Sequence, residues 1–247
     1  MKNAVGILGG VGPLATVYFM DMLIKMTEAE KDQDHIDMLV SNHSTIPDRT
    51  AYIVGTSDVS PEPAMVADAE MLQNAGCQFI VIPCNTAHFF FEEIEASVEI
   101  PVLNIIKETI AYAVEKVSHC GCTKPAGAGV KLGILATEGT VSSGTYSWYG
   151  NPMGVTCIAP DEEYQQKVNE IIYGKVKAGQ PVSLEEMGEL VEHMRAKGCD
   201  AVIMGCTELS VAYKDLGLGE IYPDVIDSLT VLARQTILKC GKKLRCE

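Results

Sequence analysis

The sequence predicts an α/β protein of two pseudo-symmetric domains. Each is expected to be a parallel-sheet-based α/β sandwich, with the candidate site in the cleft between them. The first observation is an alternation of short apolar runs with segments of helical periodicity, which is typical of βα units. The second is an internal duplication: Gly-Cys, six residues and a second Cys begin at Gly76 and again at Gly198, an offset of 122 (198 − 76). The same offset relates Cys84 to Cys206, so a duplicated fold would place these cysteines at equivalent points.

Seven apolar runs are predicted to be strands. They are continuously apolar rather than alternating, as expected for strands that helices cover on both faces. In chain order they span residues 4–8, 36–41, 79–83, 102–105, 131–136, 154–158 and 201–204.

Helices are expected between the strands, and the clearest one spans residues 184–197. Ser183 is its predicted N-cap, Glu186 completes a capping box, and Gly198 can end it in a left-handed turn. The Gly-, Pro- and Ala-rich stretch 120–129 is predicted to be a surface loop between the two halves.

Composition limits the class of partner. The chain has 247 residues, 47% of them hydrophobic, and carries 19 Lys and Arg against 33 Asp and Glu, a net charge of −14. An acidic balance argues against nucleic acid and against an anionic membrane surface, but a few local cations can still bind a small acidic substrate. The N-terminal residues lack a signal-peptide layout, and no apolar stretch reaches the roughly 18–20 residues of a membrane span. We therefore expect a soluble, cytoplasmic protein with no membrane partner.

The nine cysteines do not suggest a disulfide framework, because their number is odd and several lie inside apolar runs. Cys77, Cys157 and Cys199 are interpreted as small buried hydrophobic residues. Four others lie in polar segments without a second ligand pair at zinc-site spacing, and no role is assigned to them: Cys120, Cys122, Cys240 and Cys246.

Cys84 and Cys206 each follow a predicted strand and precede a helical segment. In parallel α/β sheets, ligands bind beyond the carboxyl ends of the strands, where both thiols would lie. The residues after them, Asn85-Thr86 and Thr207-Glu208, can offer N–H groups and side-chain donors to an anion. A helix N-terminus also lowers the pKa of a thiol. Two such thiols on opposite sides of one small molecule could exchange protons with it without a cofactor.

A glycine-rich turn follows the first predicted strand. Its Gly10-x-Gly12-x-x-Ala15 spacing formally matches a dinucleotide fingerprint. However, the next strand ends in Ser-Asn-His at residues 41–43, without the carboxylate that binds a ribose hydroxyl, and Pro13 removes an N–H that such a turn uses. We therefore favour a turn whose backbone amides, at Gly10 and Val11, bind a substrate carboxylate.

Two basic side chains are also candidates for binding a substrate carboxylate. Arg49 follows the second strand at the same sheet edge and can hold a carboxylate with two hydrogen bonds. Lys167 is a weaker candidate for a second carboxylate contact, for which an ordinary surface lysine is the alternative.

A metal site is the competing interpretation of the cysteines. His88 stands four residues after Cys84, and both could join Cys206 and Glu208 around zinc. No compact ligand cluster supports that site, and thiols that bind zinc cannot act as bases, so no metal is predicted.

The chain resembles the aspartate/glutamate racemase family. The matching segments occur in family order over nearly the whole chain. They are residues 6–16 (GILGGVGPLAT), 46–50 (IPDRT), 83–88 (PCNTAH), 133–137 (GILAT) and 205–209 (GCTEL).

The resemblance implies two domains, residues 1–106 plus 212–247 and residues 107–211, because each half lends its last helix to the other domain. It implies catalysis without pyridoxal phosphate, metal or another cofactor, and a homodimer. Cys84 and Cys206 become the acid/base pair and Arg49 the side-chain carboxylate contact. Asn85, Thr86 and Thr207 become contacts for the α-carboxylate or amino group.

The chain also departs from parts of the family. Cell-wall glutamate racemases usually carry Asp-Ser in the first loop and Cys-Thr-His in the second motif, where this chain has Gly9-Gly10 and Cys206-Thr207-Glu208. Val11 stands where methionine is more usual.

Three functions remain open from the sequence. The first is racemisation of aspartate or glutamate. The second is a lyase or isomerase reaction on a related dicarboxylate or hydantoin, as in maleate isomerases or hydantoin racemases. The third is non-catalytic sensing of an acidic amino acid. The sequence does not decide between aspartate and glutamate, nor which thiol serves which enantiomer.

Overall fold

The computed structural model describes residues 4–119 and 129–245. The chain forms two compact units, one of residues Met1–Glu108 with Leu229–Glu247 and one of residues Thr109–Ser228. Cys120, Cys122 and Cys246, and the predicted loop up to residue 128, lie outside the described residues.

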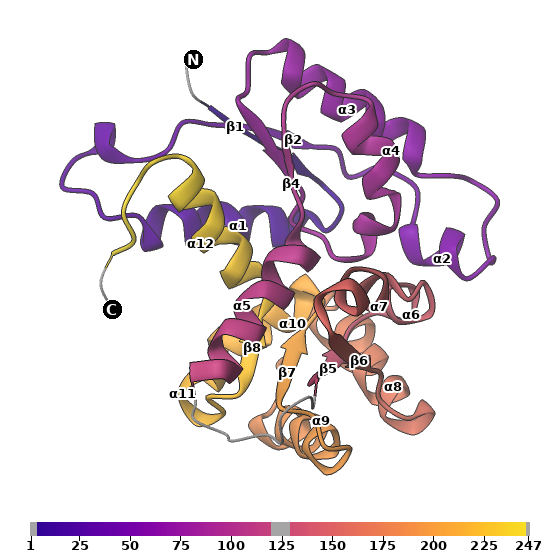
Figure 1. The fold of residues 1–247 in the computed structure, drawn as a ribbon. Coiled ribbons are helices and arrows are strands. Elements are labelled where there is room, and N and C mark those ends of the chain that lie inside the picture. The colour runs from indigo at the N-terminus through magenta and orange to yellow at the C-terminus, as the bar shows by residue number, and fades with distance from the viewer. Residues whose placement is uncertain (1–3, 120–128, 246–247) are drawn as a thin grey trace. The chain divides into compact units, whose positions relative to one another are not determined.

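A parallel four-stranded sheet forms the centre of the first unit (Figure 1). All five residues of its strand β1 are buried, as expected for a central strand covered on both faces. In spatial order the strands are β2 (Met38–Asn42), β1 (Val5–Gly9), β3 (Phe79–Val81) and β4 (Val102–Leu103). The accompanying helices are α1 (Pro13–Met26), η1 (Asp32–Asp34), α2 (Arg49–Ile53), α3 (Glu62–Asn74), η2 (Thr86–Phe90), α4 (Phe91–Ala96), the start of α5 (Ile105–His119) and α12 (Ser228–Lys239).

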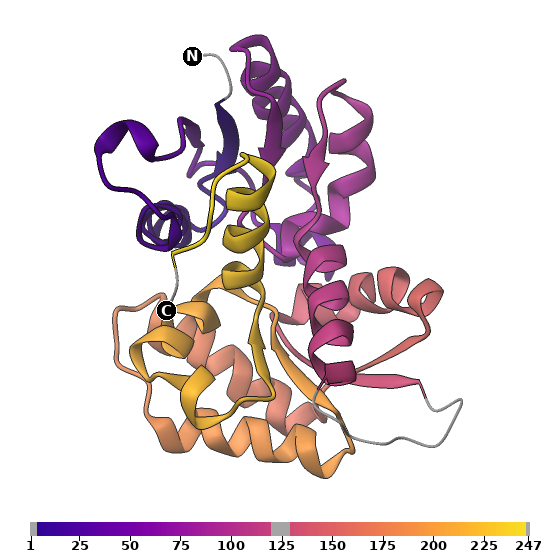
Figure 2. The same cartoon turned by 60° about the vertical axis from the view of Figure 1, so that its left-hand side comes forward.

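Helix α3 shows why the sequence folds this way. Met65, Ala69 and Leu72 recur at helical spacing, are fully buried, and face the core beside β1 and β3. Burying a Met or Leu side chain contributes about 1.5–3 kcal/mol, so this stripe fixes the helix on the sheet. α12 comes late in the chain but belongs to this unit (Figure 2), and the tail after it pairs with the end of α1 through an isolated bridge between Thr27 and Leu244.

The second unit repeats the first. Its parallel sheet has the order β6 (Val155–Ile158), β5 (Val130–Leu135), β7 (Ala201–Met204) and β8 (Val225–Asp227). Adding four to each strand number of the first sheet gives this order, so the duplication seen in the sequence is a duplication of topology. Its helices are the remainder of α5 from Thr109, α6 (Glu138–Ser142), α7 (Thr145–Gly150), η3 (Asn151–Met153), α8 (Glu162–Asn169), η4 (Glu170–Val176), α9 (Leu184–Ala196), α10 (Thr207–Asp215) and α11 (Leu218–Ile221).

Helix α9 agrees with its predicted limits. The Ser183 hydroxyl accepts the Glu186 N–H, and the Glu186 carboxylate accepts the Ser183 N–H, which is the predicted capping box. Gly198 follows the helix with φ +78°, the left-handed conformation expected at a helix end.

Strand β8 was not among the seven predicted strands, because it is only three residues long. It pairs with β7, and α10 and α11 also pack within this unit. The second unit therefore extends to Ser228, whereas the resemblance placed the boundary near Ala212; the other boundary, at Glu108, lies two residues after the expected Ile106.

Candidate active site

The candidate residues of the first unit gather at the carboxyl edge of its sheet. β1 and β3 are neighbours with Ile7 opposite Val81, so the turn at Gly10 and the segment at Cys84 leave the sheet side by side. The chain runs from β1 outward to β2 and then returns across β1 to β3, which makes this point a topological switch, the usual place of a ligand in such sheets.

The glycine turn is held tightly by its own hydrogen bonds. Gly10 has φ +81°, and a Cβ there would lie 2.4 Å from backbone atoms of His43, so only glycine fits. Its N–H donates to the buried Thr16 hydroxyl at 2.9 Å. The Gly10 amide is thus bonded within the turn. The expected contact of this turn with a substrate carboxylate stays a prediction. Val11 is buried in the same core cluster as Cys84.

Cys84 is buried and forms no disulfide, and its backbone is bonded by His88. The His88 Nδ1 lies 2.8 Å from the Cys84 carbonyl oxygen, and the His88 Nε2 lies 3.2 Å from the Ile105 nitrogen. Since the Ile105 N–H donates to Nε2, the proton of the neutral ring sits on Nδ1 and is donated to Cys84. Both ring nitrogens are engaged, so His88 offers no lone pair to the metal site that the sequence left as an alternative.

Burial governs the charge of His88. Desolvation lowers its pKa from 6.5 to about 4, although the backbone carbonyls of Cys84 and Leu103 favour the charged form. The ring is therefore neutral at neutral pH and stacks on Phe91 with centroids 5.6 Å apart.

Arg49 begins α2, directly after the N-cap residue Asp48, which accepts the Ala51 N–H. Its Nη1 donates to the carbonyls of Pro47 and Ile46 at 3.1 and 3.4 Å. The Arg49 Nε is buried without a hydrogen-bond partner. An unpaired buried donor is costly, which makes Arg49 suited to donate a hydrogen bond to an anionic ligand.

Asn85 and Thr86 follow Cys84 and are both buried. Asn85 is the N-cap residue of η2, and Thr86 begins this short 3₁₀-helix, so the helical segment expected after Cys84 is present. Their buried polar side chains stay beside the thiol at the sheet edge.

The second unit presents Cys206 at the corresponding edge. The thiol follows β7 and is the N-cap residue of α10, while the neighbouring strand β5 ends opposite Met204. A Cβ on Gly205 would lie 3.2–3.3 Å from the ring and hydroxyl of Tyr146, so this glycine lets the tyrosine pack against the loop that carries Cys206.

Glu208 faces the Cys206 thiol. The Cys206 Sγ donates to Glu208 Oε2 at 3.0 Å, and the Thr207 hydroxyl donates to the same oxygen at 3.3 Å. The Lys177 ammonium lies 3.7 Å from the other oxygen, Oε1.

These surroundings shift the pKa of the Cys206 thiol in the direction opposite to the expected one. Burial, followed by the charge and hydrogen bond of Glu208, raises the pKa of Cys206 well above its ordinary value, whereas the sequence predicted a lowering by the helix N-terminus. The nearby Lys177 acts in the lowering direction but is a smaller influence.

Lys167 is engaged elsewhere. Its ammonium lies 2.6 Å from Glu189 and 3.3 Å from Glu163, above the ring of Tyr164. Glu189 chiefly raises the pKa of Lys167 through its hydrogen bond. These contacts fit the alternative of a surface lysine. The lysine that lies beside the Cys206 motif is Lys177, which sequence reasoning missed because its position depends on the geometry of η4.

None of the six cysteines within residues 4–119 and 129–245 forms a disulfide. Of the three cysteines predicted to be small buried hydrophobic residues, Cys77 is buried, whereas Cys157 and Cys199 are only partly buried. Burial raises the pKa of Cys77 and Cys199, and raises the pKa of Cys157 and of Cys240 to about 11. These thiols are poor nucleophiles at neutral pH.

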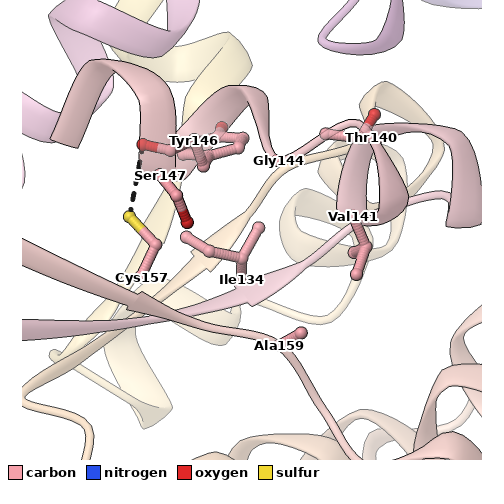
Figure 3. A pocket seen from close by; sticks show the side chains of 8 residues that line it. All are labelled: Ile134, Thr140, Val141, Gly144, Tyr146, Ser147, Cys157 and Ala159. Carbon is pink, nitrogen blue, oxygen red and sulfur yellow. Dashed lines mark hydrogen bonds between the residues drawn. The ribbon is translucent and has the colours of Figure 1, made fainter. Parts of the chain in front are cut away.

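A small pocket of the second unit lies apart from the predicted site residues (Figure 3). It is bounded by β5, β6, α6 and α7, and the Cys157 thiol at its wall donates to the Tyr146 carbonyl at 3.4 Å. None of the predicted substrate or catalytic residues lines it.

In the part of the chain that the structure describes, no three His, Cys, Asp or Glu side chains are grouped to hold a metal ion. No helix within those ranges has the length and apolar character of a membrane span.

Comparisons with known proteins identify the family to which the chain is similar. The family described as Asp/Glu/Hydantoin racemase matches residues 8–236. The broad specificity amino-acid racemase RacX of Bacillus subtilis is 30% identical over 237 residues, which cover 94% of this chain and 96% of RacX.

Solved structures of racemases are also similar to this chain. Picrophilus torridus aspartate racemase superposes with a TM-score of 0.77 and 32% identity, covering 99% of this chain and 96% of its own. Glutamate racemase from Campylobacter jejuni shares the fold, with a TM-score of 0.59 and 17% identity over all of this chain and 88% of its own.

Proposed function

Because the chain belongs to the Asp/Glu/hydantoin racemase family, we propose that it interconverts the enantiomers of an acidic amino acid by a two-thiol, cofactor-independent reaction. The observation that carries this proposal is the equivalence of Cys84 and Cys206. Each cysteine is buried, forms no disulfide, and lies just after the third strand of a sheet with the same order of strands.

The proposed reaction has two coupled proton transfers at the substrate Cα. One cysteine, as thiolate, takes the Cα proton and becomes a thiol, and the electron pair of the C–H bond delocalises into the α-carboxylate. The other cysteine, as thiol, gives its proton to the opposite face of Cα and becomes a thiolate. The reverse reaction exchanges these roles, so no oxidant or reductant is needed.

Substrate contacts are assigned from the chemistry of the flanking residues. Asn85, Thr86 and Thr207 are the proposed partners of the α-carboxylate and amino group, and stabilisation of the developing charge contributes about 3–4 kcal/mol per well-placed donor, by analogy with oxyanion holes. Arg49, with its unpaired buried Nε, is the proposed partner of the side-chain carboxylate.

The substrate proposal is aspartate or glutamate. It rests on Arg49 and on the likeness to Picrophilus torridus aspartate racemase, whereas RacX is named for a broad specificity. A cytoplasmic homodimer is a further part of the proposal and rests on the family alone.

The test is proton NMR of L-aspartate and L-glutamate in D₂O with reduced enzyme, without added pyridoxal phosphate. We expect the Cα–H signal to disappear while the D-enantiomer forms. Cys84→Ser and Cys206→Ser should each reduce this rate by orders of magnitude, because a serine hydroxyl is a far weaker acid than a thiol and its alkoxide is not populated at neutral pH. Cys157→Ser, at a thiol whose pKa is about 11, is the matched control and should keep the activity.

Each other outcome contradicts a stated part of the proposal. Full activity of Cys84→Ser in both directions would contradict the two-thiol reaction. An unchanged spectrum with both amino acids would contradict racemisation of aspartate and glutamate. Turnover of maleate with an adduct on one cysteine would favour an isomerase instead, and ligand-induced stabilisation without Cα exchange would favour a sensor.

A further inference from the structure

We propose that Glu208 is the proton-exchange partner of Cys206, linking this buried thiol to solvent, and that Lys177 positions it. The inference rests on the proposed function, because it assigns a role in returning Cys206 to its working protonation state. It concerns residues of the second unit alone.

Three groups form a continuous chain from the buried thiol to the surface. The Cys206 side chain is buried, its Sγ donates to Glu208 Oε2 at 3.0 Å, and the Glu208 side chain is 13% exposed. The Lys177 ammonium lies 3.7 Å from Glu208 Oε1 and is 40% exposed. One carboxylate thus bonds the thiol through one oxygen and meets a solvated cation through the other.

An irregular helix places the lysine. η4 (Glu170–Val176) is a π-helix, and the Lys177 N–H continues its pattern by donating to the Ile172 carbonyl, five residues back, at 3.0 Å. η4 packs against α10, the helix that carries Glu208. Segments of π-helix occur often at functional sites, because the extra residue per turn redirects the side chains that follow.

The ring of Tyr173 supports the same lysine. The Lys177 ammonium lies 4.5 Å above its centroid, so it is held between an aromatic face and a carboxylate. This arrangement keeps the cation beside Glu208 while leaving it in contact with water.

The exchange step conserves protons and charge. The proton leaves Cys206 Sγ and bonds to Glu208 Oε2, which gives a thiolate and a neutral carboxylic acid. Water then takes the proton from the carboxylic acid and restores the carboxylate. Reversal of the two transfers returns a proton to the thiolate and restores the thiol. A racemase that works by two thiols needs such a step, because every turnover leaves each thiol in the opposite protonation state.

Other charged or titratable groups around Cys206 do not replace Glu208. Tyr146 also interacts with Cys206, and burial raises the pKa of the tyrosine well above its ordinary value, so it stays neutral. The Ser210 hydroxyl donates to Asp227 at 2.5 Å, and both residues are buried. Among these groups, Glu208 is the carboxylate bonded to the sulfur.

The first test is the alkylation rate of Cys206, which is read without any substrate. Wild type, Glu208→Gln and Lys177→Met are treated with iodoacetamide across pH 6–10, and Cys206 is followed by fragment-ion mass spectrometry, which separates it from Cys199. Glu208→Gln removes a charge that raises the pKa of the thiol, so alkylation at neutral pH should accelerate about tenfold for each unit by which the pKa falls. Lys177→Met should slow alkylation, because the lysine acts in the opposite direction.

The second test is racemisation by the same proteins. Glu208→Gln should lower kcat by tenfold or more and alter its pH profile, although its thiolate fraction has risen. Faster alkylation with slower turnover is the expected signature, because a merely structural defect has no reason to increase thiolate formation. Glu185→Gln, an exposed carboxylate of α9, is the control and should change neither rate.

The outcomes separate this proposal from the proposed function. Unchanged alkylation in Glu208→Gln would overturn the thiol–carboxylate contact itself. Faster alkylation with unchanged or faster turnover would overturn the exchange role and leave racemisation intact. If wild type exchanged no Cα–H at all, the proposed function would fail, and with it the exchange role, even if the alkylation rates confirmed the contact.

Discussion

His88 makes the folded protein sensitive to mild acid. The ring is 1% exposed, receives the Ile105 N–H at Nε2 and gives its own N–H to the Cys84 carbonyl. Protonation would place a second hydrogen on Nε2, against the Ile105 N–H, and would bury a charge. The folded state therefore resists protonation of this ring, whereas the unfolded chain does not.

The sign and size of the effect follow from the two pKa values. His88 has a folded pKa of about 4 against an ordinary value of 6.5. As the pH falls below 6.5 the unfolded chain binds a proton that the folded chain excludes, so stability is lost between pH 6.5 and about 4 and then changes no further from this group. A difference of about 2.5 pKa units corresponds to about 3 kcal/mol.

Urea unfolding at several pH values from 7 to 4 measures this loss. The free energy of unfolding of the wild type should fall on acidification. In His88→Asn the total loss between pH 6.5 and about 4 should be smaller by up to about 3 kcal/mol. His193 acts in the same direction and Glu108, whose pKa burial raises, in the opposite one, so the difference between variants is the measured quantity. His119→Asn, on the exposed end of α5, is the control.

A second measurement keeps the prediction testable where His88→Asn does not fold. Nitrogen-15 NMR of the wild-type histidines should show one neutral ring with its proton on Nδ1 down to pH 5. If every histidine ring became protonated with a pKa above 6, the reasoning would be refuted.

Two further predictions concern backbone positions. Gly10→Ala should destabilise the protein by more than about 2 kcal/mol and disturb the Cys84 edge, because the new Cβ would overlap the His43 backbone; Gly55→Ala, with φ +76° and open space around it, is the matched control and should cost only about 1 kcal/mol. Similar urea midpoints for the two variants would contradict this. Ser183→Ala should cost about 1 kcal/mol by removing the N-cap of α9, and an unchanged midpoint would mean that the cap is not formed in solution.

The fold was largely predictable from the sequence because its signals are local. The seven predicted strands are all present, with limits that differ by one or a few residues, and the capping residues of α9 mark its start as predicted. The duplication predicted two similar sheets, which the identical strand order confirms. β8 was too short for a periodicity signal, although the sequence places Pro223 before it as it places Pro101 before β4.

The site was less predictable because its properties arise from packing. A helix N-terminus lowers the pKa of a thiol, and this rule alone gave the wrong direction for Cys206, where burial and Glu208 are the larger influences. Glu208 stood two residues from the cysteine in the sequence, but its orientation toward the sulfur was not encoded in that spacing. Lys177 depended on the π-helical geometry of η4, which a 3.6-residue periodicity does not predict.

The two halves share a topology but have diverged in the chemistry around their thiols. At Cys206, a carboxylate accepts the S–H, and its charge opposes thiolate formation. At Cys84, the position two residues later is Thr86, and the nearby ionisable side chain is His88, which is neutral and bonded to the cysteine backbone rather than to its sulfur. Equivalent positions in a duplicated fold therefore need not be equivalent acids. The equilibrium between the two enantiomers fixes only the ratio of the forward and reverse reactions. The two thiols of a racemase can therefore differ in proton affinity, provided that each regains its starting protonation state after turnover. That requirement gives a carboxylate beside one of them a function that symmetry alone would not predict.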